Sequence, residues 1–202
     1  MRPAPLAVLL AAGLALAGCG DAGDAGDPTV APASSAPSST AAPSPAAGSA
    51  QDVAFLSGMV PHHEQAVEMA ELVLAKDPSP PVRALAERIR AAQDPEVAEM
   101  RGMLDRLGAG GHGGGHGGGH GDGAAHGGMM TEEQLAQLRA AEGAEAERLF
   151  LELMVEHHRG AVEAADAQVA QGQDAEAVAL ARRIREVQQA EVDEMTALLR
   201  RL

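Results

Sequence analysis

The sequence predicts an all-α protein whose folded part is a four-helix bundle made from two duplicated helical hairpins. Two observations lead to this fold class. Apolar residues recur at helical rather than alternating spacing, in segments rich in Ala, Leu, Glu, Arg, Met and Gln, which are good helix formers. In addition, a segment of the first half of the chain is repeated in the second half. Two hairpins that are each apolar on one side bury those sides against each other, which gives a four-helix bundle.

The repeat aligns without gaps at an offset of 95 residues. Residues 55–63 (FLSGMVPHH) lie over residues 150–158 (FLELMVEHH), so that Phe, Leu, Met, Val and both His coincide. Further along, Arg88-Ile89-Arg90 matches Arg183-Ile184-Arg185, and Glu99-Met100 matches Glu194-Met195. The duplication predicts approximate two-fold symmetry within the bundle.

Hairpin 1 is predicted at residues 51–107. The segment Asp77-Pro78-Ser79-Pro80-Pro81 breaks the chain, because proline cannot continue a helix from its interior. We therefore expect one helix at about 52–76 and a second at about 80–107.

Hairpin 2 is predicted at residues 129–202. Residues 172–174 mark its turn, with Asp174 as the N-cap of the last helix. Thr131-Glu132-Glu133-Gln134 has the form of a capping box and starts a preceding helical stretch, which is interrupted near Gly143.

The start of the chain predicts an exported lipoprotein. Arg2 precedes an apolar run, Leu6–Ala17, that is too short to span a bilayer and has the form of a secretory signal. Leu16-Ala17-Gly18-Cys19 resembles the bacterial lipoprotein box, in which the chain is cut before a cysteine that is then lipidated. We expect a signal peptide at 1–18 and a lipid on Cys19, hence an extracytoplasmic protein anchored to the cell membrane. The alternative is an ordinary signal peptide followed by an incidental cysteine.

Two segments of low complexity are expected to lack packed structure. Residues 19–50, mostly Ala, Pro, Ser, Gly and Asp, bury too little apolar surface to fold and predict a disordered tether. Residues 108–128 form a Gly-rich linker between the hairpins. Its imidazoles favour auxiliary capture of Cu(II), Zn(II) or Ni(II), although a plain linker is the alternative. These side chains are His112, His116, His120 and His126.

Composition excludes several classes of function. The chain has 15 basic and 29 acidic side chains, a formal charge of −14, which argues against nucleic-acid binding. A single Cys cannot form an internal disulfide, a Cys-rich zinc site or an iron–sulfur cluster. With no Trp or Tyr and two Phe, the residues left for chemistry are His, Met and the carboxylates.

The helical spacing places His and Met on the inner faces of the predicted helices. In the first helix of each hairpin, adjacent histidines flank the line of a methionine that precedes them by three residues. The predicted ligands of the first repeat are Met59, His62, His63, Met69, Glu96, Met100 and Met103. Those of the second repeat are Met154, His157, His158, Glu191 and Met195. Because Ala164 and Leu198 replace Met69 and Met103, we expect the first site to be richer in sulfur.

A metal site competes with a simpler interpretation, in which Met fills a core and each buried His is satisfied by a hydrogen bond. The paired motif favours metal, because a core has no packing reason to gather imidazoles and a carboxylate. Residues Met59 and Met154 stand where di-iron bundles have the Glu of a Glu-x-x-His pair. Thioether with imidazole suits Cu(I), so copper is the predicted metal.

The pattern Asp-x-x-Phe-x-x-x-Met-x-x-His-His, followed on the next helix by Glu-x-x-x-Met, resembles the bacterial "domain of unknown function 305" family. The resemblance covers residues 51–107 and 129–202. It implies an extracytoplasmic, ferritin-like helical protein linked to copper binding or resistance. Glu147 replaces the Asp of the motif in the second copy, and Ala164 departs from the usual Met. Side chains predicted to lie behind the ligands and orient them are Asp52, Glu147, Gln93 and Gln188.

These observations predict a membrane-tethered protein that binds or sequesters Cu(I) without catalytic turnover. The alternatives are a ferritin-like metal oxidase or reductase and a metal-independent bundle that binds a protein partner or has a structural role. The lack of Glu-x-x-His pairs, and of Tyr or Trp for electron relay, argues against the enzyme. The expected partners are metal ions and a membrane, through the lipid, and not nucleic acid.

Overall fold

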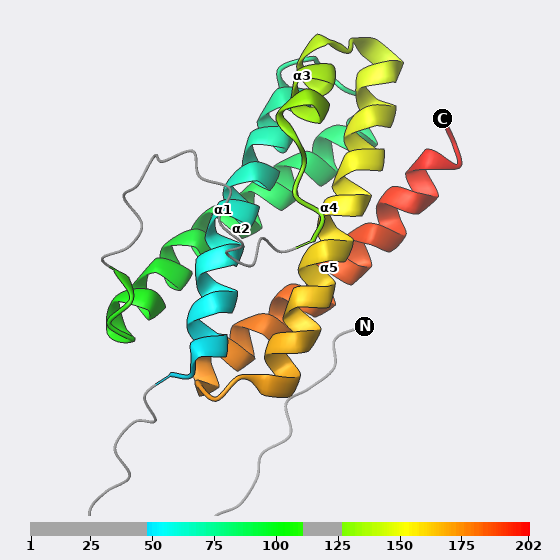
Figure 1. Cartoon of the computed structure of the whole chain (residues 1–202). Coiled ribbons are helices and arrows are strands. Elements are labelled where there is room, and N and C mark those ends of the chain that lie inside the picture. The colour runs from blue at the N-terminus through cyan, green and yellow to red at the C-terminus, as the bar shows by residue number, and fades with distance from the viewer. Residues whose placement is uncertain (1–47, 111–126) are drawn as a thin grey trace, which may run out of the picture. The chain divides into compact units, whose positions relative to one another are not determined.

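The computed structural model describes residues 48–110 and 127–202, which are helical apart from short turns (Figure 1). The helices are α1 (Ala50–Leu74), α2 (Pro80–Arg106), α3 (Glu132–Ala140), α4 (Gly143–Gln171) and α5 (Ala175–Leu199). Within these two ranges there is no β-strand, so the all-α prediction is confirmed. The predicted signal peptide and Cys19 lie outside the described residues, as do His112, His116, His120 and His126.

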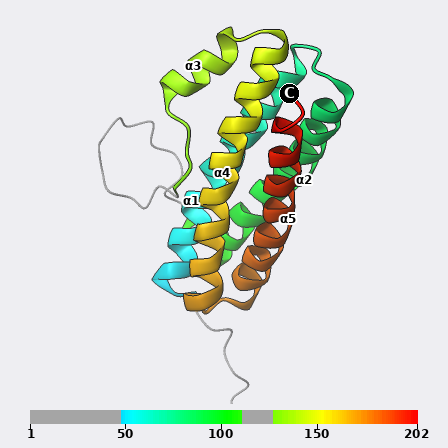
Figure 2. The same ribbon diagram turned by 90° about the vertical axis from the view of Figure 1, so that its right-hand side faces the viewer.

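The four long helices form the bundle, and α1 of one hairpin lies side by side with α4 of the other (Figures 1 and 2). Helix α1 packs along α2, and α4 packs along α5, as two hairpins require. The short α3 contacts α1 and α4 and lies across one end of that pair (Figure 2). The predicted interruption near Gly143 is the corner between α3 and α4, where Gly143 has a positive φ of 53°.

Side-chain caps fix where several helices begin. Ser49 accepts a hydrogen bond from the backbone N–H of Asp52 and forms a capping box at the start of α1. Thr131 does the same with Gln134 at the start of α3, and Asp174 accepts from the N–H of Ala177 at the start of α5. Each cap satisfies a backbone donor that the first turn of a helix leaves unpaired. The predicted N-caps Thr131 and Asp174 are therefore confirmed.

Two apolar clusters fill the bundle, and each draws on both hairpins. The Phe55 cluster joins Phe55, Met59 and Met100 to Ala161, Ala165, Ala177, Leu180 and Ile184. The Phe150 cluster joins Phe150, Met154 and Met195 to Ala66, Met69, Ala70, Leu85 and Ile89. The two Phe are repeat equivalents, so each hairpin packs its Phe and Met side chains against apolar residues of the other.

Two carboxylates clasp the hairpins together at opposite ends. Asp52 of α1 accepts hydrogen bonds from the backbone N–H groups of Gln173 and Asp174, at distances of 3.0 and 3.1 Å, and from Gln168 Nε2 at 2.6 Å. Its repeat equivalent, Glu147 of α4, accepts from the N–H and hydroxyl of Ser79 at 2.8 and 2.6 Å. Helix α1 thus holds the start of α5, and α4 holds the start of α2.

Candidate metal centre

Four histidines, two from each repeat, meet where α1 and α4 cross. His62 and His63 of α1 and His157 and His158 of α4 are all fully buried. The ring centroids of His62 and His157 lie 3.7 Å apart, with an angle of 37° between the ring planes. Since these two residues are repeat equivalents, the two predicted His pairs come together at the pseudo-two-fold axis of the bundle.

A carboxylate holds the outer histidine of each pair. The Nε2 atom of His63 lies 2.9 Å from Glu96 Oε2, and the Nε2 atom of His158 lies 2.8 Å from Glu191 Oε2. A carboxylate only accepts hydrogen bonds, so Nε2 of each ring carries a proton, and Nδ1 is the nitrogen that has a lone pair when the ring is neutral. Both Nδ1 atoms are buried without a hydrogen-bond partner. Metal-binding histidines have this arrangement, in which the nitrogen away from the metal donates to a carboxylate.

His157 is held in its neutral form. Burial lowers its pKa well below the ordinary value of 6.5, and the neighbouring rings of His62, His158 and His63 lower it further. Neither ring nitrogen has a hydrogen-bond partner of normal geometry, although a marginal contact with the His62 backbone acts on the pKa in the opposite direction. Neutral imidazole is the form that binds metals, so this ring can act as a ligand near neutral pH.

Methionines flank the histidines in both apolar clusters. Met59 and Met154 lie one turn before the His pairs, and Met100 and Met195 lie on the second helix of each hairpin; all are fully buried. Met103 lies in the Phe55 cluster, whereas Met69 lies in the Phe150 cluster with Met154 and Met195. Met130 also belongs to the Phe150 cluster, so both clusters contain methionines beyond the repeated pairs. The larger sulfur content of the first site stays a prediction. Sequence offset alone could not show that Met69 faces the other hairpin.

The acidic and imidazole groups alone do not make a preformed metal cage. In the two described ranges, no group of three or more His, Cys, Asp or Glu side chains could hold a metal ion by itself. A metal ion at the crossing of α1 and α4 would therefore need thioether sulfur in addition to imidazole nitrogen, which is the donor set that soft metals prefer.

The residues predicted to orient the ligands divide into two kinds. Gln93 and Gln188 are buried, and the amide oxygen of each has no hydrogen-bond partner. Asp52 and Glu147 instead form the interhelical clasps, and Asp52 precedes His62 by ten residues, about 15 Å along the helix. Their predicted role beside the ligands is therefore wrong: a helical wheel shows which face a side chain occupies, but not its height.

Hydrogen bonds account for the buried charge of Asp52. Burial raises the pKa of its carboxyl, but hydrogen bonds from Ser49, Gln168 and Asp174 outweigh this effect and hold the pKa below the ordinary 3.8. Gln168 is a buried partner that the sequence analysis missed, because it lies outside the repeated motif.

The segment before α3 packs closely on α1 and α4. The side-chain amide of Gln65 bonds both the N–H and the carbonyl of Met130, at 2.7 and 3.0 Å. A Cβ atom on Gly160 of α4 would lie 1.6 Å from the Gly127 carbonyl oxygen, so only glycine allows this approach. The sequence analysis missed this contact, although a Gly two residues after the second His pair was a visible signal.

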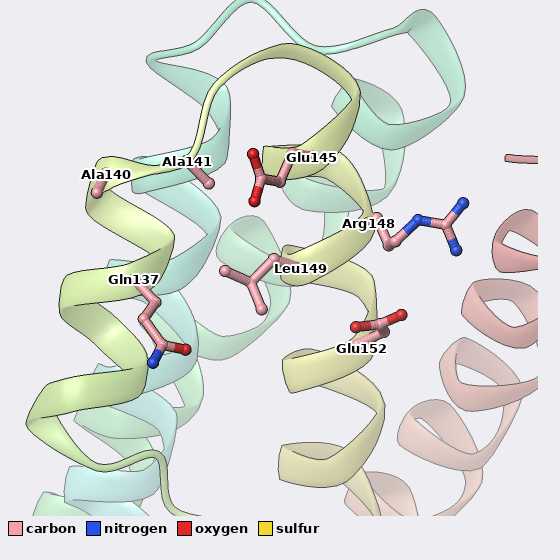
Figure 3. A pocket seen from close by; sticks show the side chains of 7 residues that line it. All are labelled: Gln137, Ala140, Ala141, Glu145, Arg148, Leu149 and Glu152. Atoms are coloured by element: carbon pink, nitrogen blue, oxygen red, sulfur yellow. The ribbon is translucent and has the colours of Figure 1, made fainter.

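A separate pocket lies between α3 and α4, away from the histidines. Figure 3 shows its walls, with Gln137 and Ala140 on α3 and Glu145, Leu149 and Glu152 on α4. No His or Met lines this pocket. It is therefore a part of the described surface unrelated to the candidate centre.

Comparison with known proteins decides the family. The model of the family described as "Domain of unknown function (DUF305)" matches residues 52–199. The chain belongs to this family. The match covers all five helices, so the resemblance seen in the sequence is confirmed.

Solved structures of DUF305 proteins have the same fold. A fragment from Deinococcus radiodurans is 33% identical, with a TM-score of 0.67, over 77% of this chain and 99% of that one. A Streptomyces coelicolor protein, assigned as secreted, is 32% identical, with a TM-score of 0.66, over 75% of this chain and 93% of that one. CopM in its Cu(I)-bound form is 26% identical, with a TM-score of 0.60, over 74% of this chain and 96% of that one. CopM structures also include Cu(II)- and Ag-bound forms.

A viral protein matches a shorter stretch. "Uncharacterized protein L153" of Acanthamoeba polyphaga mimivirus is 35% identical over 54 residues, which are 27% of this chain and 36% of that protein. The match therefore spans about a third of the viral relative. Within the described residues of the present chain, no helix has both the length and the apolar character needed to cross a membrane.

Proposed function

We propose that this DUF305 protein binds and sequesters Cu(I) at one centre shared by its two hairpins. The observation that carries this proposal is the meeting of both His pairs between α1 and α4, with unpartnered nitrogens on His63, His157 and His158. Burying such atoms without a partner is unfavourable, which a bound metal ion would offset.

The donor atoms favour a soft cation. The proposed centre takes its ligands from among the four histidines together with Met59, Met100, Met154 and Met195, and Met69 and Met103 supply further sulfur in the clusters beside it. Thioether and neutral imidazole favour Cu(I) over Fe, Mn, Mg or Ca. Glu96 and Glu191 orient His63 and His158 through the observed hydrogen bonds and are not required as direct ligands.

The related structures support a copper-related role. CopM, whose whole length the chain nearly spans, has been solved with Cu(I), Cu(II) and Ag bound. Transfer of this property to the present chain rests on the paired His and Met residues described above rather than on overall similarity.

We further propose that the protein works outside the cytoplasm, tethered by a lipid on Cys19. The sequence before residue 20 supports this location, as does the related Streptomyces coelicolor protein assigned as secreted. Methionine ligands suit an oxidising compartment, because they cannot be lost to disulfides as thiolates can. The linker histidines would capture Cu(II), Zn(II) or Ni(II) as an auxiliary set.

The test is competition for Cu(I) against a coloured, Cu(I)-selective chelator without oxygen. The wild-type protein should remove Cu(I) from the chelator, and a Met59→Leu/His62→Leu/Met100→Leu variant should lose at least a hundredfold in affinity. Ile89→Val, which trims a buried side chain without a ligand atom, controls for packing and should bind as wild type. Unchanged affinity in the triple variant would contradict the assignment.

Two further measurements separate the alternatives. Stoichiometric oxygen consumption while the protein is loaded with metal would favour a metal oxidase over a sequestering protein. Equal melting temperatures with and without Cu(I) would favour a metal-independent bundle, because a ligand that binds only the native state must raise that temperature.

A further inference from the structure

A groove runs along the seam between α2 and α5, on the side of the bundle away from the α1–α4 contact. Its apolar lining includes Ala92, Val187 and Ala190. Val187 is 47% exposed, one of two large hydrophobic side chains so exposed among the described residues. The ion pair between Arg88 and Glu194 crosses the same seam.

The groove reaches the candidate centre through Glu191. This residue lines the groove, its side chain is 11% exposed, and its Oε2 lies 2.8 Å from Nε2 of the fully buried His158. One carboxylate thus contacts both the solvent-filled groove and a proposed metal ligand. Its repeat equivalent, Glu96, is 21% exposed and holds His63 in the same way.

Buried amides lie at the middle of the same seam. The ion pairs Arg88–Glu194 and Arg183–Glu99 align α2 and α5 antiparallel, and the positions midway along them are Gln93 and Gln188. Both are 2% exposed, and both amide oxygens lack a hydrogen-bond partner. These two amide oxygens are buried acceptors to which a cation that has left water can bind in passing.

On the opposite side of the centre, the described residues pack closely together. Helix α3 lies against α1 and α4, and Met130 is fixed to Gln65 by two hydrogen bonds. Beside them, a Cβ on Gly128 would lie 2.7 Å from the carbonyl oxygen of Glu156, next to His157. Among the described residues, backbone therefore packs directly on backbone at this side, in contrast to the α2–α5 seam.

We propose that the α2–α5 groove is the route by which the metal ion reaches and leaves the buried histidines, with the Glu191 carboxylate at its inner end. This inference rests on the proposed function, because it presumes a metal centre at the His pairs. The route explains why the Glu191 carboxylate, which holds His158, keeps part of its surface in solvent while the ring is fully buried.

The experiment fills the groove and measures rates separately from affinity. In Ala92→Leu/Ala190→Leu, Leu keeps high helix propensity while its side chain occupies the seam. Stopped-flow transfer of Cu(I) from a coloured chelator to the protein, and back into excess chelator, gives uptake and release rates. Both rates should fall at least tenfold in the double variant, with the equilibrium transfer constant within twofold of wild type.

Matched variants make the result specific. Ala140→Leu makes the same exchange as the single variant Ala190→Leu, but at the separate α3–α4 pocket (Figure 3), and should leave both rates unchanged. Single Ala190→Leu, at an exposed helical position, gives a smaller slowing if the double variant folds poorly. Val187→Ala, which widens the groove, should raise both rates.

The outcomes separate the route from the proposed function. Normal rates in folded Ala92→Leu/Ala190→Leu, with wild-type affinity, would overturn the route and leave the metal centre standing. Equal slowing by Ala140→Leu would also overturn the route. A wild-type protein that takes up no Cu(I) would overturn both.

Discussion

Replacing His157 by Leu is expected to stabilise the metal-free protein while removing its response to Cu(I). The ring is fully buried, and neither nitrogen has a hydrogen-bond partner of normal geometry. Burying a polar group in this way costs about 1–3 kcal/mol in proteins, and Leu fills a similar volume without polar atoms. We therefore expect His157→Leu to raise the free energy of unfolding of the metal-free protein by about 1–3 kcal/mol.

The assay is thermal unfolding followed by far-ultraviolet circular dichroism, with and without equimolar Cu(I). Since about 1 kcal/mol moves the melting temperature of a domain of this size by roughly 4 °C, the metal-free variant should melt several degrees above wild type. Wild type should gain further stability from Cu(I), and His157→Leu should gain little. A histidine retained at a cost to stability is expected where it serves binding rather than folding.

His158→Leu is the matched control. Its Nε2 bonds Glu191, so the substitution leaves a mostly buried carboxylate without its partner and should lower the melting temperature. Opposite signs for two adjacent histidines would be hard to obtain from packing alone. A lower melting temperature for metal-free His157→Leu would refute the reasoning, because it would show that this ring is already satisfied in the folded protein.

Three further predictions concern stability. Asp52→Ala should destabilise the protein by about 2–4 kcal/mol in urea unfolding, because several hydrogen-bond donors lose a charged acceptor. An effect below about 0.5 kcal/mol would show that these hydrogen bonds do not hold the hairpins together. The folded state keeps the pKa of His157 below 6.5, so below that pH the unfolded state binds more protons than the folded state. The free energy of unfolding of the metal-free protein should therefore decrease as the pH falls below about 6.5, by up to about 1.4 kcal/mol per pH unit. A flat urea-unfolding profile between about pH 5 and 7 would contradict this. Gly160→Ala should destabilise the protein by about 2 kcal/mol or more, since its Cβ would meet the Gly127 carbonyl. Gly102→Ala, with open space around it in α2, should instead stabilise the protein by about 0.5–1 kcal/mol. Equal effects of the two substitutions in the same assay would contradict the close contact.

The sequence was sufficient to predict the hairpins and the inward direction of the His pairs. Helix formers, proline breaks and the 95-residue repeat are local signals, and the caps at Thr131 and Asp174 follow from short-range hydrogen bonds. The histidines could be placed on an inner face because the helical period fixes direction.

The relation between the hairpins could not be predicted in the same way. Which side chains of one hairpin meet those of the other depends on the height at which α1 and α4 cross, and no local signal encodes that height. For this reason Asp52 and Glu147 were expected near the ligands and are instead clasps. Met69 was grouped with its own motif but packs with Met154 of the other hairpin for the same reason.

The measurement that tests the shared centre most directly is a Cu(I) titration of His62→Leu by chelator competition. It is made with His112, His116, His120 and His126 replaced by Ser, in both the variant and its reference protein. Because His62 lies 3.7 Å from His157, a shared centre predicts that this one substitution weakens every tightly bound Cu(I) at least tenfold. Retention of half of the bound Cu(I) at the affinity of the reference protein would show two independent sites and would contradict the account.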